Sequence, residues 1–330
     1  MKIDELRAAL GKYDADALKQ IVVELYKTIP KSQKENNGID DFLLDFTKEK
    51  NKPAKKEAPV DFEELKVEIG QFLEYADLQY YLAPNKYVKK EKRSKWRFEV
   101  KRFIKSLTSV VGDNSDEAGR MLADIYTMLS YACHYSIFST DSPFSAVGYE
   151  QSELLSLVLK KIFYGGYSPG AIKTAVFLTL DSNASWNTLN RNLSSTLLDI
   201  LKTTDIKEEA LKQCVAYRDE YDSYNSAKKL FKELDSSGYR RKEHRNDAAE
   251  LYLMIKFSLC EYDEGIGYYW KHAETQKPEI KLYCLLCYFL SGDDARLESL
   301  WISEYEKAVA KGIIPRESLQ NEYAQRIKEN

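Results

Sequence analysis

Histidine and cysteine, the side chains that most often act as bases, nucleophiles or metal ligands, are few in this sequence. Its 330 residues include three histidines, His134, His244 and His272, and five cysteines. No His-Glu-x-x-His motif occurs, and no cysteine and histidine spacing resembles a zinc knuckle. Neighbouring residues on a helix point about 100° apart, so Cys133 and His134 are poorly placed to act as nucleophile and base. We therefore expect neither a metal site nor a catalytic dyad.

One cysteine pair has a spacing that can do chemistry. Cys284 and Cys287 form a Cys-x-x-Cys motif, which redox proteins expose at a helix start and zinc sites use in two copies. Here the motif lies inside the apolar run 282–289, and no second pair accompanies it. We predict that both thiols pack in a helix core. An odd number of scattered cysteines also favours reduced thiols over a disulfide framework.

The glycine-rich segment 165–170 is a further candidate, because a helix start can bind an anion. Its sequence, Gly-Gly-Tyr-Ser-Pro-Gly, lacks the Gly-x-x-x-x-Gly-Lys-Ser/Thr pattern of a phosphate loop and follows no predicted strand. A helix end, then a cap at Ser168 with Pro169 at the first helical position, accounts for these residues. Because no set of nucleophile, base or ligands stands out, the sequence predicts a protein that is not an enzyme and has no cofactor.

Charge singles out one segment. Between Lys86 and Lys105 there are ten basic and two acidic residues, a net charge of +8 in a chain whose net charge is −3. On a helical wheel the apolar residues from Trp96 to Leu107 share one side, while the cations and Phe98 lie across from them. Cations around an aromatic ring suit phosphate contacts combined with base stacking. The predicted polyanion-binding residues are Lys89, Lys90, Lys92, Arg93, Phe98, Lys101, Arg102 and Lys105.

The sequence leaves other roles open for this basic segment. Its cations could pair with acidic helices of the same chain, with Phe98 packed under a neighbour. They could also meet an acidic protein or an anionic lipid surface. The 24 tyrosines, 13 phenylalanines and 4 tryptophans give mild support to a partner surface. The block from Tyr81 to Phe103 resembles a segment of uncharacterised bacterial helical proteins, and that resemblance implies no activity.

The elements that position these residues are expected to be helices. Gly (14) and Pro (8) make 22 of 330 residues, under 7%, whereas an average chain has about 12%. Folds rich in sheet use both residues in their turns, so the deficit predicts an all-α protein. An apolar content of 44% is enough for a sizeable core. The balanced charge excludes a globally basic nucleic-acid coat protein.

We predict a small N-terminal helical module at residues 1–47, followed by a linker at 48–60. Asp14 can cap a helix whose apolar stripe runs from Leu18 to Ile29, and a short helix follows at 39–46. Residues 48–59 contain two prolines and no large apolar side chain. Such a composition cannot bury a face, which is typical of a linker.

A central helical domain is predicted at residues 61–204. Asp61 is expected to cap its first helix, and Trp186 to begin the apolar stripe of its last one. The runs 154–163 and 171–180 are apolar nearly all round, which predicts central helices. Helices are expected at about 62–80, 94–111, 115–136, 154–163, 171–180 and 186–201.

Residues 205–330 change to short helices in pairs, typical of stacked helical hairpins. Helices are expected at about 206–218, 223–234, 243–260, 264–273, 278–290 and 295–311. The stretch 259–273, with Gly265, Tyr269 and the later Pro278, resembles the helix junction of a tetratricopeptide repeat. Cys260 stands where that family usually has Gly, and the Trp-Leu-Gly-Tyr signature is not clear before it. The resemblance implies an array of antiparallel helical hairpins, a tetratricopeptide- or HEAT-like solenoid that serves as an interaction scaffold.

The expected location is the cytoplasm, because the charged start at 1–5 is unlike a signal peptide. The longest uncharged stretch, 125–140, has 16 residues and is shorter than the roughly 20 of a membrane span. We expect a non-catalytic helical scaffold or adaptor that binds another macromolecule, most readily a protein. The alternative is a nucleic-acid-binding protein that uses residues 86–105. The sequence does not determine the identity of the partner or the oligomeric state.

Overall fold

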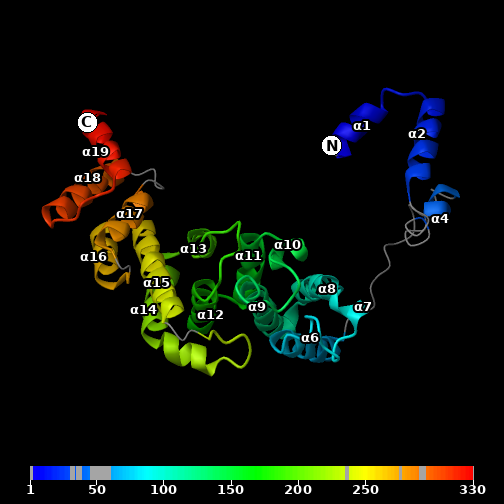
Figure 1. Cartoon of the computed structure of the whole chain (residues 1–330), viewed down its shortest axis with the longest axis horizontal. Helices are drawn as coiled ribbons and strands as arrows, with labels where there is room; N and C mark the ends of the chain where they lie inside the picture. The colour runs from blue at the N-terminus through cyan, green and yellow to red at the C-terminus, as the bar shows by residue number, and fades with distance from the viewer. Residues whose placement is uncertain are drawn as a thin grey trace. The chain divides into compact units, whose positions relative to one another are not determined.

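The computed structural model describes residues 3–29, 34, 39–44, 61–234, 238–274, 277–289 and 295–329. Within these ranges every regular element is a helix and no strand occurs, which confirms the all-α prediction (Figure 1). No helix in the described ranges combines the length and the apolar composition needed to cross a membrane. The chain divides into two compact units, Met1–Val60 and Asp61–Asn330. The predicted linker at 48–60 lies outside the described residues.

The N-terminal unit contains α1 (Ile3–Leu10), α2 (Ala15–Thr28) and α4 (Ile39–Leu44). Asp14 caps α2 as predicted, because its Oδ1 accepts a hydrogen bond from the Ala17 amide at 2.8 Å. The hydroxyl of Tyr26 donates to Asp40 at 2.6 Å and so ties α2 to α4. No residue of α2 is buried, so its apolar stripe is not enclosed by the described part of this unit.

The larger unit begins with a bundle in which α9 packs against α6, α8 and α11. The helices of this bundle are α6 (Phe62–Asp77), α7 (Lys90–Arg93), α8 (Trp96–Ser109), α9 (Ser115–Tyr131), α10 (Pro143–Ala146), α11 (Gln151–Ile162), α12 (Pro169–Leu180) and α13 (Asn190–Leu198). Two predicted caps are present: Asp61 accepts from the Glu63 amide at 2.9 Å, and Ser168 accepts from the Ala171 amide at 3.1 Å. The glycine-rich segment 165–170 therefore contains the start of α12, as the sequence indicates.

Helices α14 to α19 continue the larger unit, and each packs against the next one in the chain (Figure 1). They are α14 (Thr204–Ala227), α15 (Tyr239–Ser258), α16 (Tyr262–His272), α17 (Pro278–Phe289), α18 (Ala295–Ala310) and α19 (Glu317–Glu329). A Cβ on Gly265 would lie 2.9 Å from the Cβ of Lys256, so a small residue is needed where α16 approaches α15. The division predicted at residue 205 stays a prediction.

Several predicted helix bounds differ from the structure: the helix predicted at 115–136 ends at Tyr131, and the one predicted at 243–260 begins at Tyr239. Two further differences have a clear reason. The sequence predicts separate helices at 206–218 and 223–234, but α14 is continuous from Thr204 to Ala227. No Gly or Pro occurs between residues 218 and 223, so nothing in the chain stops the helix there. The helix predicted from Trp186 begins only at Asn190. Trp186 is 83% exposed and Leu189 is 69% exposed, so neither belongs to the buried stripe.

Two hydrophobic cores lie in the larger unit, and α15 contributes to both. Leu251 and Ile255 belong to the first core, which is shared with α6 to α14. Ala249 and Leu253, on another side of the same helix, belong to the second core with α16 to α19. Because α15 is a wall of each core, the packing of the C-terminal helices depends directly on that of the bundle.

Candidate functional site

The basic segment is carried by α7, by α8 and by the loop before them. The predicted apolar side of α8 is buried, with Trp96 6% exposed and Val100, Phe103, Ile104 and Leu107 at 0–1%. The Trp96 ring stacks on Phe138 at 3.9 Å between centroids and anchors the start of the helix. Burial of this stripe leaves the opposite side of α8 and its cations in water.

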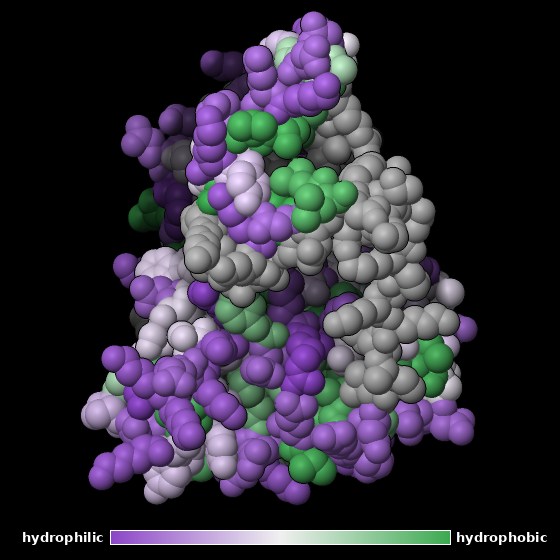
Figure 2. Space-filling model, turned by 90° about the vertical axis from the view of Figure 1, so that its right-hand side faces the viewer, coloured by the Kyte–Doolittle hydropathy of each residue, from purple (hydrophilic) through white to green (hydrophobic). Residues whose placement is uncertain are grey.

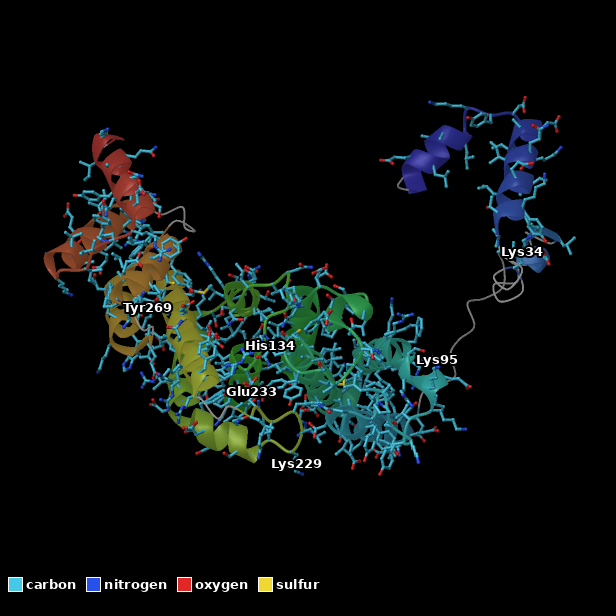
Figure 3. All side chains as sticks on the ribbon, viewed as in Figure 1. Lys34, Lys95, His134, Lys229, Glu233 and Tyr269 are labelled. Atoms are coloured by element: carbon cyan, nitrogen blue, oxygen red, sulfur yellow. The ribbon has the colours of Figure 1, made fainter. Side chains whose placement is uncertain are left out.

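Most of these cations have no acidic partner in the described part of the chain. Seven of them are exposed and form no salt bridge there, and we call this set the basic surface: Lys86, Lys89, Lys90, Lys92, Lys95, Arg97 and Lys101. Figure 3 shows Lys95 at the outer end of the larger unit. The side of the unit that carries α6 to α8, in the lower part of Figure 2, is mostly hydrophilic with isolated apolar side chains. The basic surface is thus available to a ligand.

Three other candidates have different surroundings. Arg102 forms salt bridges with Glu68 on α6 and with Glu99, at 3.0 Å for the latter, so it is already neutralised. The Arg93 side chain donates to the backbone oxygens of Val88 at 2.9 Å and Asn85 at 2.8 Å, which gives it a structural role. Lys105 is exposed on α8. Five of the eight predicted residues are exposed, and their four cations form no salt bridge in the described part of the chain: Lys89, Lys90, Lys92, Phe98 and Lys101.

Exposed aromatic rings lie among the cations. Phe98 is 60% exposed, and the Arg97 guanidinium lies 4.9 Å from its ring centroid. Tyr87 is 70% exposed and stacks on Tyr80, with 4.0 Å between centroids and 9° between ring planes. No sequence pattern predicts this tyrosine pair, because the stacking depends on a loop conformation. The position of Tyr87 between Lys86 and Lys89 was the available signal for a ligand contact.

Asn85 organises the loop that carries Tyr87. Its side-chain amide donates to the backbone oxygens of Tyr80 and Leu82. Its Oδ1 accepts from the amides of Tyr87 and Val88, both at 3.1 Å. Together with the two Arg93 hydrogen bonds, these contacts hold the backbone between residues 80 and 88 in one conformation.

A second group of charged side chains lies inside the larger unit, along one side of α15. We call it the seam and define it as Asp181, Asn183, Glu233, His244 and Asp247. The side chains of Glu233 and His244 are each 3% exposed, and their Oε2 and Nε2 atoms are 3.7 Å apart. Asn183 Nδ2 donates to Glu233 at 2.9 Å, and His244 Nδ1 donates to the Leu180 carbonyl at 2.8 Å. Figure 3 labels Glu233 within the larger unit, where 5% of the residue is exposed.

The protonation states in the seam follow from burial and pairing. Burial disfavours the ionised form of Glu233, but the nearby His244 ring and the hydrogen bond from Asn183 outweigh it and hold the pKa of Glu233 at about 2. Burial lowers the pKa of His244, but Glu233 and Asp181 raise it by more, so the pKa of His244 lies above its ordinary value. Burial and the neighbouring Glu250 raise the pKa of Asp247 to about 7. Glu233 and His244 are an enclosed ion pair that a substrate cannot reach.

Other chemistry-bearing residues do not form a site in the described part of the chain. No group of three or more His, Cys, Asp or Glu there has the geometry to hold a metal ion. Cys284 and Cys287 are half-buried on α17. Burial raises the pKa of Cys284 to about 11, so this thiol stays protonated at neutral pH.

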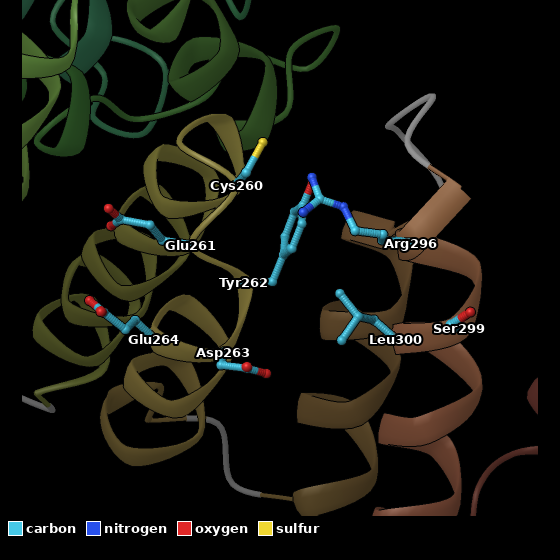
Figure 4. A pocket seen from close by; sticks show the side chains of 8 residues that line it. All are labelled: Cys260, Glu261, Tyr262, Asp263, Glu264, Arg296, Ser299 and Leu300. Atoms are coloured by element: carbon cyan, nitrogen blue, oxygen red, sulfur yellow. The ribbon is translucent and has the colours of Figure 1, made fainter.

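An open groove of about 560 Å³ lies between α16 and α18. Tyr262, Arg296 and Leu300 point into this groove, whereas Glu261 and Glu264 point away from it (Figure 4). Both glutamates bind Lys256 of α15, at 2.5 and 2.6 Å. Cys260, Asp263 and Ser299 also line the groove, so polar and apolar side chains are mixed in it.

Comparisons of this chain with family models, with curated proteins and with solved structures found no significant match. Functional inference for this protein therefore depends on its own geometry.

Proposed function

We propose that this protein is a non-catalytic helical binding protein that engages a polyanionic macromolecule through the basic surface. The observation that carries the proposal is a set of seven exposed cations that form no salt bridge within the described residues. An exposed charge is well solvated and contributes little to stability. Cations clustered on one surface create a positive field that attracts a polyanion. Intramolecular pairing, the main alternative for this segment, accounts for Arg102 but not for Lys89, Lys90 or Lys92.

The remaining architecture supports a scaffold rather than an enzyme. Helices α14 to α19 pack in succession, which favours the hairpin array that the tetratricopeptide-like stretch implies. Within the described residues His244 and Glu233 converge in the seam, and this pair is closed to solvent. A cytoplasmic location stays a prediction.

The test is a binding titration with an abasic 20-mer, a deoxyribose-phosphate chain that carries phosphates but no bases. We expect the full chain to bind it at low salt and to lose affinity steeply as salt rises. Replacing Lys89, Lys90 and Lys92 together by Ala should weaken binding and flatten the log–log salt slope by about 2 to 3 units, since each phosphate contact contributes about 0.7–0.9.

A matched control removes the same charge elsewhere. Lys242, Lys271 and Lys311 are exposed and lie outside the basic surface, so their triple replacement by Ala should leave the slope nearly unchanged. Equal losses in both triple variants would mean that binding follows net charge alone. In that case, or if the abasic strand does not bind at low salt, the proposal is wrong.

A protein partner is the second candidate, and the groove between α16 and α18 favours it. Leu300 offers apolar contact there, and Arg296, which lies over the buried Tyr262 ring, offers charge. This candidate predicts a partner that co-purifies after nuclease treatment and is lost with Leu300→Lys. A partner that survives that substitution would contradict the use of this groove.

A further inference from the structure

Building on the proposed function, we infer that the ligand of the basic surface is single-stranded nucleic acid and that its bases stack on Tyr87 and Phe98. Two large rings on this surface are left in water. Tyr87 is 70% exposed and Phe98 60% exposed, although burial of such side chains is favourable. Both rings stand among exposed cations that form no salt bridge in the described chain.

The tyrosine pair has the geometry of a stacking platform. Tyr80 covers one face of the Tyr87 ring at 4.0 Å and nearly parallel, and the high exposure of Tyr87 leaves its other face accessible. A nucleobase placed on that face would continue an existing stack. Stacking of a base on an aromatic side chain contributes about 1–3 kcal/mol and works for every base.

The platform is rigid before any ligand binds. Asn85 fixes the backbone on both sides of the turn, and Arg93 holds the carbonyls of Asn85 and Val88. Tyr81 and Trp96 both contact the buried Phe138 ring, at 5.6 and 3.9 Å, so the loop and α8 share one anchor. Because the loop is already ordered, binding does not have to order it, which favours affinity.

Charge is placed beside each ring. Lys86 and Lys89 flank Tyr87 in the chain, while Arg97 lies 4.9 Å from the Phe98 ring and Lys101 follows one turn later on α8. A single strand offers phosphates and unstacked bases together, and this surface offers a partner for both.

The same features disfavour other polyanions. A duplex keeps its base faces stacked inside, so Tyr87 and Phe98 would have nothing to stack on. An anionic lipid surface would attract the cations, but α8 could not insert its apolar side, which is buried in the bundle. An acidic protein would use the cations without requiring two exposed rings.

The test compares a 20-nucleotide thymidine strand with the abasic strand of the same length, using the full chain at one salt concentration. We expect the base-bearing strand to bind about 5- to 100-fold more tightly. Tyr87→Ala and Phe98→Ala should each reduce this ratio, whereas Tyr87→Phe should preserve it because the ring remains. Trp186→Ala is the matched control, since Trp186 is an aromatic residue 83% exposed outside the basic surface.

The outcomes separate this inference from the function on which it rests. Equal binding of the two strands, with both lost in the Lys89, Lys90 and Lys92 triple variant, would leave polyanion binding intact and overturn the inference. Tighter binding to a 20-base-pair duplex or to phosphatidylserine vesicles than to the thymidine strand would also overturn it. Absence of binding to either strand would overturn both. Unchanged thermal melting of Tyr87→Ala and Phe98→Ala would show that a loss of binding is not a loss of fold.

Discussion

The basic surface and the seam treat charge in opposite ways. On the basic surface, Lys89, Lys90 and Lys92 are exposed and form no salt bridge within the described residues. In the seam, Glu233 and His244 are enclosed and meet each other. Water solvates an exposed cation at little cost, but an ion removed from water must be compensated by its neighbours. Exposed cations can therefore cluster without a partner in the same chain, whereas buried charges require one and so belong to the architecture of the fold.

The strongest way to break this comparison is to remove one member of the buried pair. Glu233→Ala would leave His244 and the amide of Asn183 without their partner. Loss of one partner of a buried ion pair usually costs about 3–5 kcal/mol, so we expect the free energy of unfolding to fall by that amount. Urea denaturation followed by circular dichroism measures it.

Glu208→Ala is the control for this substitution. Glu208 is exposed on α14, and its removal should change the free energy of unfolding by less than about 0.5 kcal/mol. If Glu233→Ala cost no more than Glu208→Ala, the seam would not be a stabilising element and the contrast with the basic surface would fail. Under conditions in which the Glu233→Ala variant is folded, its affinity for the abasic strand should equal that of the unsubstituted protein.

The next largest effect is expected in the pH dependence of the free energy of unfolding, which reports the titration of the seam. The native pKa of Asp247, about 7, lies above its ordinary value, so stability should fall as pH rises from about 4 to 7. The raised pKa of His244 adds a further loss as pH rises above 6.5. Glu233, with a native pKa of about 2, acts in the other direction and loses stability as pH falls from 4.5 toward 2. The seam should therefore be most stabilising between about pH 4 and 5.

Asp247→Asn isolates one part of this profile. An amide cannot ionise, so the loss between pH 4 and 7, on the order of 1–3 kcal/mol, should shrink in the variant. The measurement is the free energy of unfolding at pH 4, 5.5, 7 and 8 for both proteins. Parallel pH profiles would contradict the assignment of this loss to Asp247.

The smallest effect, and the sharpest comparison, comes from two neighbours on α8. Lys101 forms no salt bridge in the described chain, whereas Arg102 binds Glu68 and Glu99. Lys101→Ala should flatten the salt slope for the abasic strand by about 0.7. Arg102→Ala should leave that slope nearly unchanged and lower the free energy of unfolding by less than about 1 kcal/mol. Equal slope changes in the two variants would show that pairing state does not decide which cation binds.

Local patterns predicted much of this molecule. The Gly and Pro deficit predicted an all-α chain, and single side chains such as Asp61 and Ser168 located helix starts. The apolar side of α8 followed from its helical period, because burial of that side is a property of one helix. The exposure of Phe98 among cations followed from the same wheel.

Long-range contacts explain what the sequence did not reveal. In the segment after α14, the Phe231 amide donates to Asp77 at 2.7 Å, across 154 positions of sequence. Glu233 meets Asn183 from 50 positions away, and no local pattern encodes that pairing. The spacing of three between His244 and Asp247 on the predicted helix 243–260 was a usable signal for the seam. Its partners could be known only from the fold.

The membership of α15 in both cores has a consequence for how the chain could be shortened. In a true solenoid a terminal repeat can be removed, because each repeat contacts only its neighbours. Here a truncation after Ser258 would expose Ala249 and Leu253, and it would take away the Tyr288 hydroxyl that donates to Glu250. The bundle that carries the basic surface would keep a helix with one apolar side facing water. Helices α16 to α19 cover one apolar side of α15, so a minimal ligand-binding fragment should extend to the end of α19.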